Sequence, residues 1–151
     1  MKALYTAEAT VHGGRDGHVR SSDGILDMDL RVPAEMGGPG GAATNPEQLF
    51  AAGYSACFES ALRLVARTQR SPLTDAGITA RVTLNLTEDK RYVLGVELRG
   101  RLAGVTRDEA AALMRAAHDV CPYSNATRGN VEVRLVAEVD APSPTPVPGP
   151  R

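Results

Sequence analysis

The hydrophobic positions of the chain follow two spacings, one typical of strands and one of helices. Hydrophobic residues alternate with polar ones over residues 26–32, 78–86, 94–99 and 131–139, as in strands that bury one face. Residues 3–11, rich in Thr, Val and Ala, add a fifth predicted strand. Helical spacing predicts two helices, one from residue 45 through residue 65 and one from residue 106 to residue 121. This order of elements predicts an α+β fold with mostly antiparallel sheets.

Both predicted helices begin with residues that satisfy free backbone amides. In Asn45-Pro46-Glu47-Gln48, the asparagine suits the N-cap, the proline the first position and the glutamate the helix dipole. The glutamine of this motif can close a capping box. Thr106-Arg107-Asp108-Glu109 is a capping box as well. These motifs give both helices a defined start.

The first predicted helix is expected to lie at the centre of the molecule. Its first half consists mostly of Ala, Gly, Ser and Leu, with little charge on any face. A helix on the surface would have a charged side. One small sheet cannot cover a helix that is apolar nearly all round, so we expect a homodimer to bury it.

Glycine and proline mark the connections and the end of the predicted domain. Residues 13–17 contain three glycines and indicate a tight turn with positive φ, while the glycines of residues 37–41 indicate a flexible connector. Residues 142–150 have proline at every second position, which predicts a disordered extended tail. We therefore expect one domain over residues 1–140 and a tail over residues 141–151.

Composition and charge narrow the function classes. A chain of 151 residues with 42% hydrophobic residues can bury a core without disulfides or metals. Its 17 basic and 18 acidic residues give a net charge of -1, which argues against nucleic-acid binding. No apolar run approaches the ~20 residues of a membrane span, and the first residues do not resemble a signal peptide. We therefore expect a cytoplasmic protein without a membrane or nucleic-acid partner.

The two cysteines, Cys57 and Cys121, are the first candidates for chemistry. In a reducing compartment a thiol pair is more often redox-active, metal-binding or simply buried than a structural disulfide, and the scattered His residues lack zinc-site spacing. Pro122 disfavours helical geometry at Cys121, which places this cysteine at the end of the second helix. If the two helices pack side by side, the thiols could form a reversible disulfide; otherwise each is a small buried residue.

A reactive Cys57 needs a nearby cation to become a thiolate, and the sequence offers candidates. Arg15 projects from the glycine-rich turn, either as a solvated loop residue or as the partner of Glu47 in a bidentate ion pair. Glu47 could also simply complement the helix dipole. His118 could act as a base or be structural, and Arg128 is a loop arginine without an obvious partner.

Helix geometry limits how Glu47 can take part. Ten positions separate it from Cys57, which is about 15 Å along a continuous helix and about 80° out of phase. The two side chains cannot share a site directly within one chain unless the helix breaks. Either Arg15 spans part of the gap, or Glu47 is supplied by the other subunit; we favour the second, which fits the expected dimer.

Four stretches of the chain closely resemble organic hydroperoxide resistance proteins, the Ohr branch of the OsmC/Ohr superfamily. They are residues 13–17, residues 37–41, residues 44–58 with Ala56-Cys57-Phe58 at their end, and residues 117–130 with Cys121-Pro122-Tyr123-Ser124 inside. The resemblance covers residues 2–139, in order. It implies an intertwined α+β homodimer with two active sites at the subunit interface, acting as a cofactor-free, thiol-dependent peroxidase.

The resemblance also implies a role for each candidate residue. Cys57 matches the peroxidatic cysteine and Cys121 the resolving cysteine, while Arg15 and Glu47 match the pair that activates the first thiol. The implied substrate is an organic hydroperoxide, and the implied reductant is a dihydrolipoyl group on a partner protein or a small dithiol. The substrate needs an apolar pocket. Its candidate wall residues, each equally well explained as core, are Phe50, Phe58, Met36 and Tyr123.

Three rival functions remain open at this point. The sibling OsmC branch has similar chemistry with a different balance of substrates. A hydrolase could use Cys57 as the nucleophile and His118 as the base. A sensor or ligand-binding dimer would be oxidised stoichiometrically without consuming peroxide in the steady state.

Overall fold

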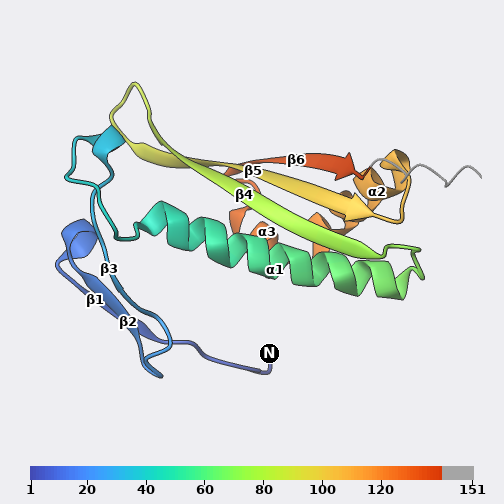
Figure 1. Ribbon diagram of the computed structural model, residues 1–151, viewed down its shortest axis with the longest axis horizontal. Coiled ribbons are helices and arrows are strands. Elements are labelled where there is room, and N and C mark those ends of the chain that lie inside the picture. Colours follow the sequence, from blue (N-terminus) through green and yellow to red (C-terminus); the bar gives the residue numbers. More distant parts are fainter. Residues whose placement is uncertain (141–151) are drawn as a thin grey trace, which may run out of the picture. The chain divides into compact units, whose positions relative to one another are not determined.

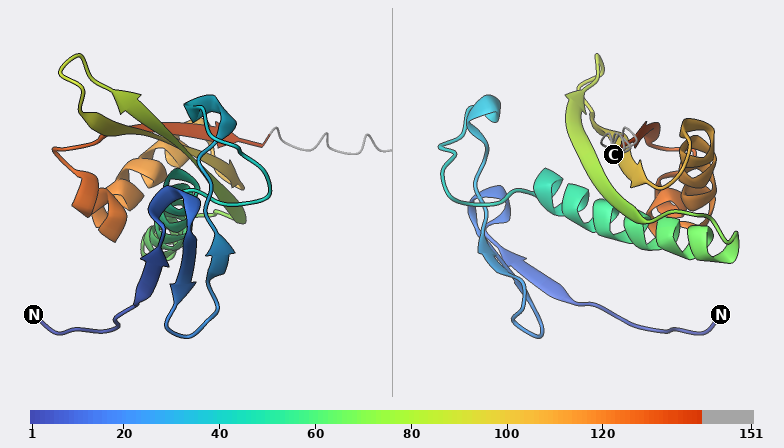
Figure 2. Two further views of the ribbon diagram at one scale, coloured as in Figure 1. Left: turned by 90° about the vertical axis from the view of Figure 1, so that its left-hand side faces the viewer. Right: turned by 45° about the vertical axis from the view of Figure 1, so that its right-hand side comes forward.

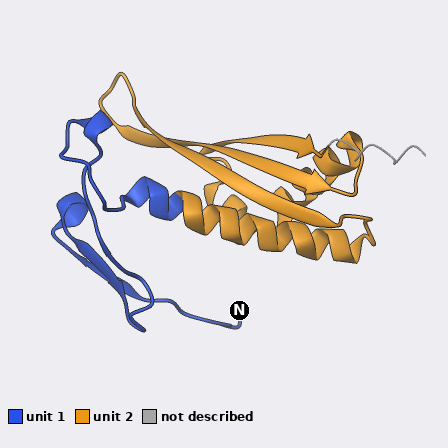
Figure 3. Cartoon of the chain, in the orientation of Figure 1, with its two compact units in different colours: residues 1–50 blue, residues 51–151 orange. Residues whose placement is uncertain are grey.

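The computed structural model describes residues 1–140, and the chain falls into two compact units (Figure 3). The first unit comprises residues 1–50 and the second begins at Ala51, so the boundary lies inside one long helix. The predicted disordered tail, residues 141–151, lies outside the described residues. The expectation of a single domain over residues 1–140 stays a prediction.

The first unit is built on a three-stranded antiparallel sheet in the order β1-β2-β3. Its strands are β1 (Ala9–His12), β2 (His18–Ser21) and β3 (Asp27–Asp29). The glycine-rich turn joins β1 to β2, and Gly13 and Gly14 have the positive φ angles expected there. This turn contains one short 3-10 helix, η1 (Gly14–Asp16), which carries Arg15.

The extents of two strands predicted in this unit are wrong. The strand expected over residues 3–11 begins at Ala9, because its partner β2 ends at Ser21, opposite Ala9. Within residues 26–32, only β3 pairs as a strand; Leu30 is buried as expected, but Met28 is exposed. The four-residue β2 was not predicted, since so short a segment shows little alternation.

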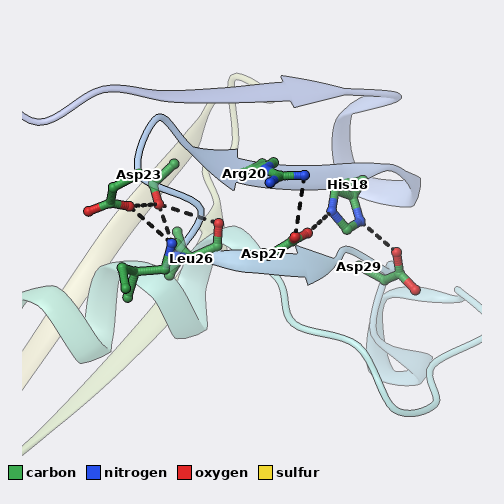
Figure 4. A network of polar contacts seen from close by, with 8 residues as sticks. His18, Arg20, Asp23, Leu26, Asp27 and Asp29 are labelled. Carbon is green, nitrogen blue, oxygen red and sulfur yellow. Dashed lines mark hydrogen bonds and ion pairs between the residues drawn. The ribbon is translucent and has the colours of Figure 1, made fainter.

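Charged side chains share one face of this first sheet (Figure 4). His18 on β2 lies between two carboxylates of β3, with Nε2 2.5 Å from Asp27 Oδ1 and Nδ1 2.8 Å from Asp29 Oδ1. Arg20 Nη1 lies 3.7 Å from Asp27 Oδ2. The hydrogen bonds to Asp29 and Asp27 raise the pKa of the exposed His18 above its ordinary value.

Helix α1 (Pro46–Thr68) begins where the sequence predicts. Asn45 Oδ1 accepts a hydrogen bond from the backbone N–H of Gln48 at 2.8 Å, which makes Asn45 the N-cap. The Gln48 side chain does not act as the capping box predicts: its oxygen accepts a hydrogen bond from the hydroxyl of Thr44. The helix ends two residues before Arg70, whose φ of 52° is left-handed.

Within the single chain, α1 is buried along one face. The buried residues are Tyr54, Phe58, Ala61, Leu62, Val65 and Ala66. Small or apolar residues are exposed at Ala52, Ala56, Ser60 and Leu64. The sequence did not show which face of this helix the chain itself covers, because low charge does not tell a buried face from an uncovered one. Burial of the remaining faces by a homodimer stays a prediction.

The second unit contains a three-stranded sheet in the order β4-β5-β6. Strands β4 (Asp75–Leu86) and β5 (Tyr92–Ala103) form an antiparallel hairpin. Helices α2 (Arg107–Val120) and α3 (Pro122–Thr127) follow, and they return the chain so that β6 (Glu132–Val139) pairs parallel to β5. The short helix α3 was not predicted.

The helices of the second unit lie on one face of its sheet (Figure 1, Figure 2). The core between them contains Val96, Leu98 and Leu102 from β5, and Ala110, Leu113, Met114 and Ala117 from α2. Thr106 and Glu109 form the predicted capping box at the start of α2. The elements confirm the predicted α+β class with mostly antiparallel pairing.

Candidate functional site

The two cysteines face each other in the second unit. Cys57 lies in the middle of α1, and Cys121 lies between α2 and α3. Their sulfur atoms are 3.7 Å apart, and both cysteines are free thiols. Cys121 has no exposed surface, whereas Cys57 is partly exposed. A small molecule can therefore reach the Cys57 thiol, whereas the Cys121 thiol is shielded from solvent.

The position of Cys121 follows from the proline after it. Its ψ of 124° ends α2, and its backbone N–H still bonds to the carbonyl of Ala117. Pro122 then takes the first position of α3, for which its fixed φ is suited. Cys121 is thus the C-cap of α2 and the N-cap of α3, and its place at the end of α2 is the one expected from Pro122. A side chain at such a junction is held by two helices at once.

Burial opposes ionisation of Cys57 within the second unit. Burial raises the pKa of the Cys57 thiol, and the neighbouring Cys121 raises it further. A hydrogen bond from the backbone N–H of Tyr123 lowers it in part. The net direction is upward, so a reactive thiolate at neutral pH needs additional positive charge.

An ion pair forms in the first unit between Arg15 and Glu47. Arg15 Nη1 and Nη2 donate to the two carboxylate oxygens of Glu47 at 2.8 and 2.7 Å, which is a bidentate contact. The arginine holds the pKa of the Glu47 carboxyl below its ordinary value. The expected ion pair is therefore present and lies within a single chain. The catalytic roles of both residues stay predictions.

The four residues proposed for a substrate pocket have different surroundings. Phe58 has no exposed surface and its ring lies 6.5 Å from that of His118, so it is a core residue. Tyr123 is 39% exposed and its ring packs 5.6 Å from that of Tyr54. In the first unit, Met36 is 44% exposed and Phe50 is partly buried. Their contact with a substrate stays a prediction.

A buried polar cluster behind the cysteines was missed by the sequence analysis. It connects Tyr54 of α1, His118 of α2, and Ser124 and Thr127 of α3. Tyr54 and Ser124 have no exposed surface, and Thr127 is 5% exposed. The one available signal was a tyrosine on the apolar face of α1, since a buried tyrosine hydroxyl normally has a partner. That partner lies 70 residues away along the chain and could not be named.

Over residues 1–140, no group of three or more His, Cys, Asp or Glu side chains is arranged to hold a metal ion. In the same part of the chain, no helix has the length and apolar character needed to cross a bilayer.

Comparison with known proteins shows consistent similarity. The model of the family described as OsmC-like protein matches residues 37–136. The organic hydroperoxide resistance protein OhrA of Bacillus subtilis is 51% identical over 141 residues, which covers 89% of this chain and 97% of that protein. A crystal structure of an organic hydroperoxide resistance protein from Legionella pneumophila is 55% identical, with a TM-score of 0.85 over 93% of this chain and 100% of the other. One from Elizabethkingia anophelis is 48% identical, with a TM-score of 0.87 over the same shares.

Proposed function

The chain belongs to the organic hydroperoxide resistance proteins of the OsmC-like family, and from this premise we propose that it is a cysteine-based peroxidase of organic hydroperoxides. The role that follows from the family is resistance to hydroperoxides, a defence against oxidative stress. The observation that carries the proposal is the 3.7 Å separation of a partly exposed and a buried thiol. Such a pair can reduce a peroxide and then close a disulfide.

The first step is the attack of the Cys57 thiolate on the hydroperoxide R–O–OH. The sulfur attacks the outer oxygen, the O–O bond breaks, and the alkoxide leaves and takes a proton to become the alcohol. Cys57 is thereby oxidised to a sulfenic acid, and the hydroperoxide is reduced. Because Cys57 is the partly exposed member of the pair, it is the residue to which we assign this attack.

The second and third steps restore the enzyme. The Cys121 thiol attacks the Cys57 sulfenic acid, which forms the disulfide and releases water. A dithiol then reduces this disulfide by exchange, leaving two thiols on the protein and a disulfide on the reductant. We propose that the reductant is a dihydrolipoyl group on a partner protein, or a small dithiol. We place the reaction in the cytoplasm.

Arg15 and Glu47 are proposed to favour the first step. Since burial raises the pKa of Cys57, a positive side chain is needed to stabilise the thiolate and the departing alkoxide, and we assign this role to Arg15. Glu47 fixes the guanidinium through its bidentate contact. No metal or cofactor takes part in the proposed scheme.

We further propose that the enzyme works as a homodimer with an apolar substrate pocket. The exposed small and apolar residues of α1, from Ala52 to Leu64, support a partner surface on this helix. The proposed pocket residues are Tyr123, Met36 and Phe50. Tyr123 follows Cys121 by two positions, and both Tyr123 and Met36 are partly exposed.

A stopped-flow experiment tests the proposed activity. The reduced protein is mixed with tert-butyl hydroperoxide, and turnover is then measured with dihydrolipoamide as the electron donor. We expect rapid formation of one intramolecular disulfide and continued turnover with the dithiol. A strong preference for hydrogen peroxide would favour the sibling branch. Stoichiometric oxidation without turnover would overturn the proposed activity in favour of a sensor.

Two variants distinguish the peroxidase from a hydrolase. Cys57→Ser should abolish peroxide reduction, because the attacking sulfur is absent. Cys121→Ser should permit one turnover and then accumulate over-oxidised Cys57, because no thiol captures the sulfenic acid. A Cys57–His118 hydrolase predicts instead that Cys121→Ser stays active and that added dithiol has no effect.

A further inference from the structure

The buried polar cluster forms one directed chain of hydrogen bonds. Thr127 Oγ1 lies 3.1 Å from the carbonyl oxygen of Tyr123 and 3.2 Å from that of Ser124, and a carbonyl can only accept. Thr127 therefore donates its single hydroxyl proton to a backbone carbonyl, and its oxygen accepts a hydrogen bond from the Tyr54 hydroxyl, 3.1 Å away. Tyr54 in turn accepts from the Ser124 hydroxyl at 2.9 Å.

The head of this chain must be His118. Ser124 donates its only hydroxyl proton to Tyr54, so the Ser124 oxygen accepts a hydrogen bond from Nδ1–H of His118 at 2.8 Å. Burial lowers the pKa of His118, and the charge of Arg128 lowers it further, against an opposite effect of Asp119. The neutral ring with its proton on Nδ1 satisfies all of these contacts at once.

The chain connects three helices at the point where the cysteines meet. Tyr54 comes from α1, three residues before Cys57, and His118 from α2, three residues before Cys121. Ser124 and Thr127 belong to α3. The first residues of α3 directly follow Cys121 and include the Tyr123 backbone N–H that bonds to Cys57. A shift of α3 would move both groups that face the Cys57 sulfur.

We propose that Tyr54, Ser124 and His118 are positioning residues of the thiol pair: their hydrogen-bond chain holds α3 so that Cys121 and the Tyr123 amide face Cys57. This inference rests on the proposed function, in which the two thiols react with each other. A helix of six residues has few internal hydrogen bonds of its own, so its orientation depends on such side-chain contacts. Arg128, whose guanidinium donates to the His118 carbonyl at 2.9 Å, adds a tie between α3 and α2.

The test measures the reactivity of Cys57 without any peroxide. The rate of its alkylation by iodoacetamide is followed from pH 5 to pH 10 by mass spectrometry of the peptide that contains Cys57. We expect Tyr54→Phe and Ser124→Ala each to move the midpoint upward by about 0.5 to 1 pH unit, because the thiolate loses an aligned amide. Thr127→Val is a third variant in case one of these does not fold.

Two comparisons separate positioning from a general loss of stability. Ser55→Ala removes the hydroxyl next to Tyr54 on α1, which accepts from the Ala80 amide at 3.0 Å, and it should keep the wild-type midpoint. His118→Asn, which can still donate to Ser124, should lie closer to wild type than His118→Leu. Unchanged midpoints in the folded Tyr54 and Ser124 variants, or an equal shift in Ser55→Ala, would overturn the proposal.

The same experiment keeps this inference apart from the proposed activity. Alkylation needs no hydroperoxide, so a protein that fails to turn over tert-butyl hydroperoxide can still show the predicted shifts. Conversely, an active enzyme with unshifted midpoints would retain its proposed function and lose its positioning chain.

Discussion

The sulfur atoms of Cys57 and Cys121 lie 3.7 Å apart although 64 positions separate them along the chain. A disulfide between them would close a long loop and restrict the unfolded chain, so oxidation should stabilise the protein. For a loop of this length the chain-entropy model gives roughly 4 kcal/mol as an upper value. Urea unfolding of the oxidised and reduced proteins measures the difference. Cys121→Ser is the control, and its stability should not respond to oxidation and reduction.

The Arg15–Glu47 ion pair predicts a defined dependence of stability on pH. The pKa of Glu47 is lower in the folded protein than in the unfolded chain. The stability that the ion pair contributes is therefore fully present above the unfolded pKa and is lost as the pH falls through the folded pKa. The melting temperature of the wild type should therefore fall more between about pH 5 and pH 3 than that of Glu47→Gln. Glu88→Gln, in the exposed turn between β4 and β5, is a matched control, and its melting temperature should fall with pH as that of the wild type does.

Local motifs predicted most of the fold because their physical causes are local. The Asn45 cap, the Thr106 capping box and the effect of Pro122 on Cys121 each depend on neighbours within a few residues. The long alternation of β4 and β5 was equally readable. The sequence alone could not show that the first strand begins at Ala9 rather than near residue 3, since that depends on where β2 ends.

The candidate site was predicted less completely than the fold. The cysteines and the Arg15–Glu47 pair were named from residue chemistry together with a family resemblance. The Tyr54–Ser124 contact joins positions 70 apart, and it arises only when α1 and α3 pack together. The direction of its hydrogen bonds needs the coordinates of every partner. Such networks are properties of packing, which no single segment contains.

His18 gives the stability of the protein a second dependence on pH, opposite in direction to that of Glu47. Its hydrogen bonds to Asp29 and Asp27 raise its pKa above 6.5 in the folded protein (Figure 4). The stabilising contribution is therefore fully present below the unfolded value and is lost as the pH rises through the folded one. NMR titration of the imidazole signal should show this raised pKa. Asp29→Asn should lower it most, because the hydrogen bond to Asp29 is the largest cause, and Asp27→Asn should lower it less. An unshifted His18 in the wild type would contradict this account.

Gly100 on β5 packs against Met114 of α2, where there is no space for a side chain. A Cβ at this position would overlap the Met114 sulfur and come within 3.0 Å of the Leu102 side chain, and Gly100, Leu102 and Met114 are all buried. Gly100→Ala should therefore lower the free energy of unfolding by about 1 to 3 kcal/mol, measured by urea denaturation. Gly77→Ala on β4 is the matched control: no atom lies within 4 Å of its new Cβ, so it should be neutral or stabilise by up to about 1 kcal/mol. In a Met114→Ala background, Gly100→Ala should cost less, because the shortened side chain leaves room for the methyl group. An equal cost in both backgrounds would show that the loss arises elsewhere than at this contact.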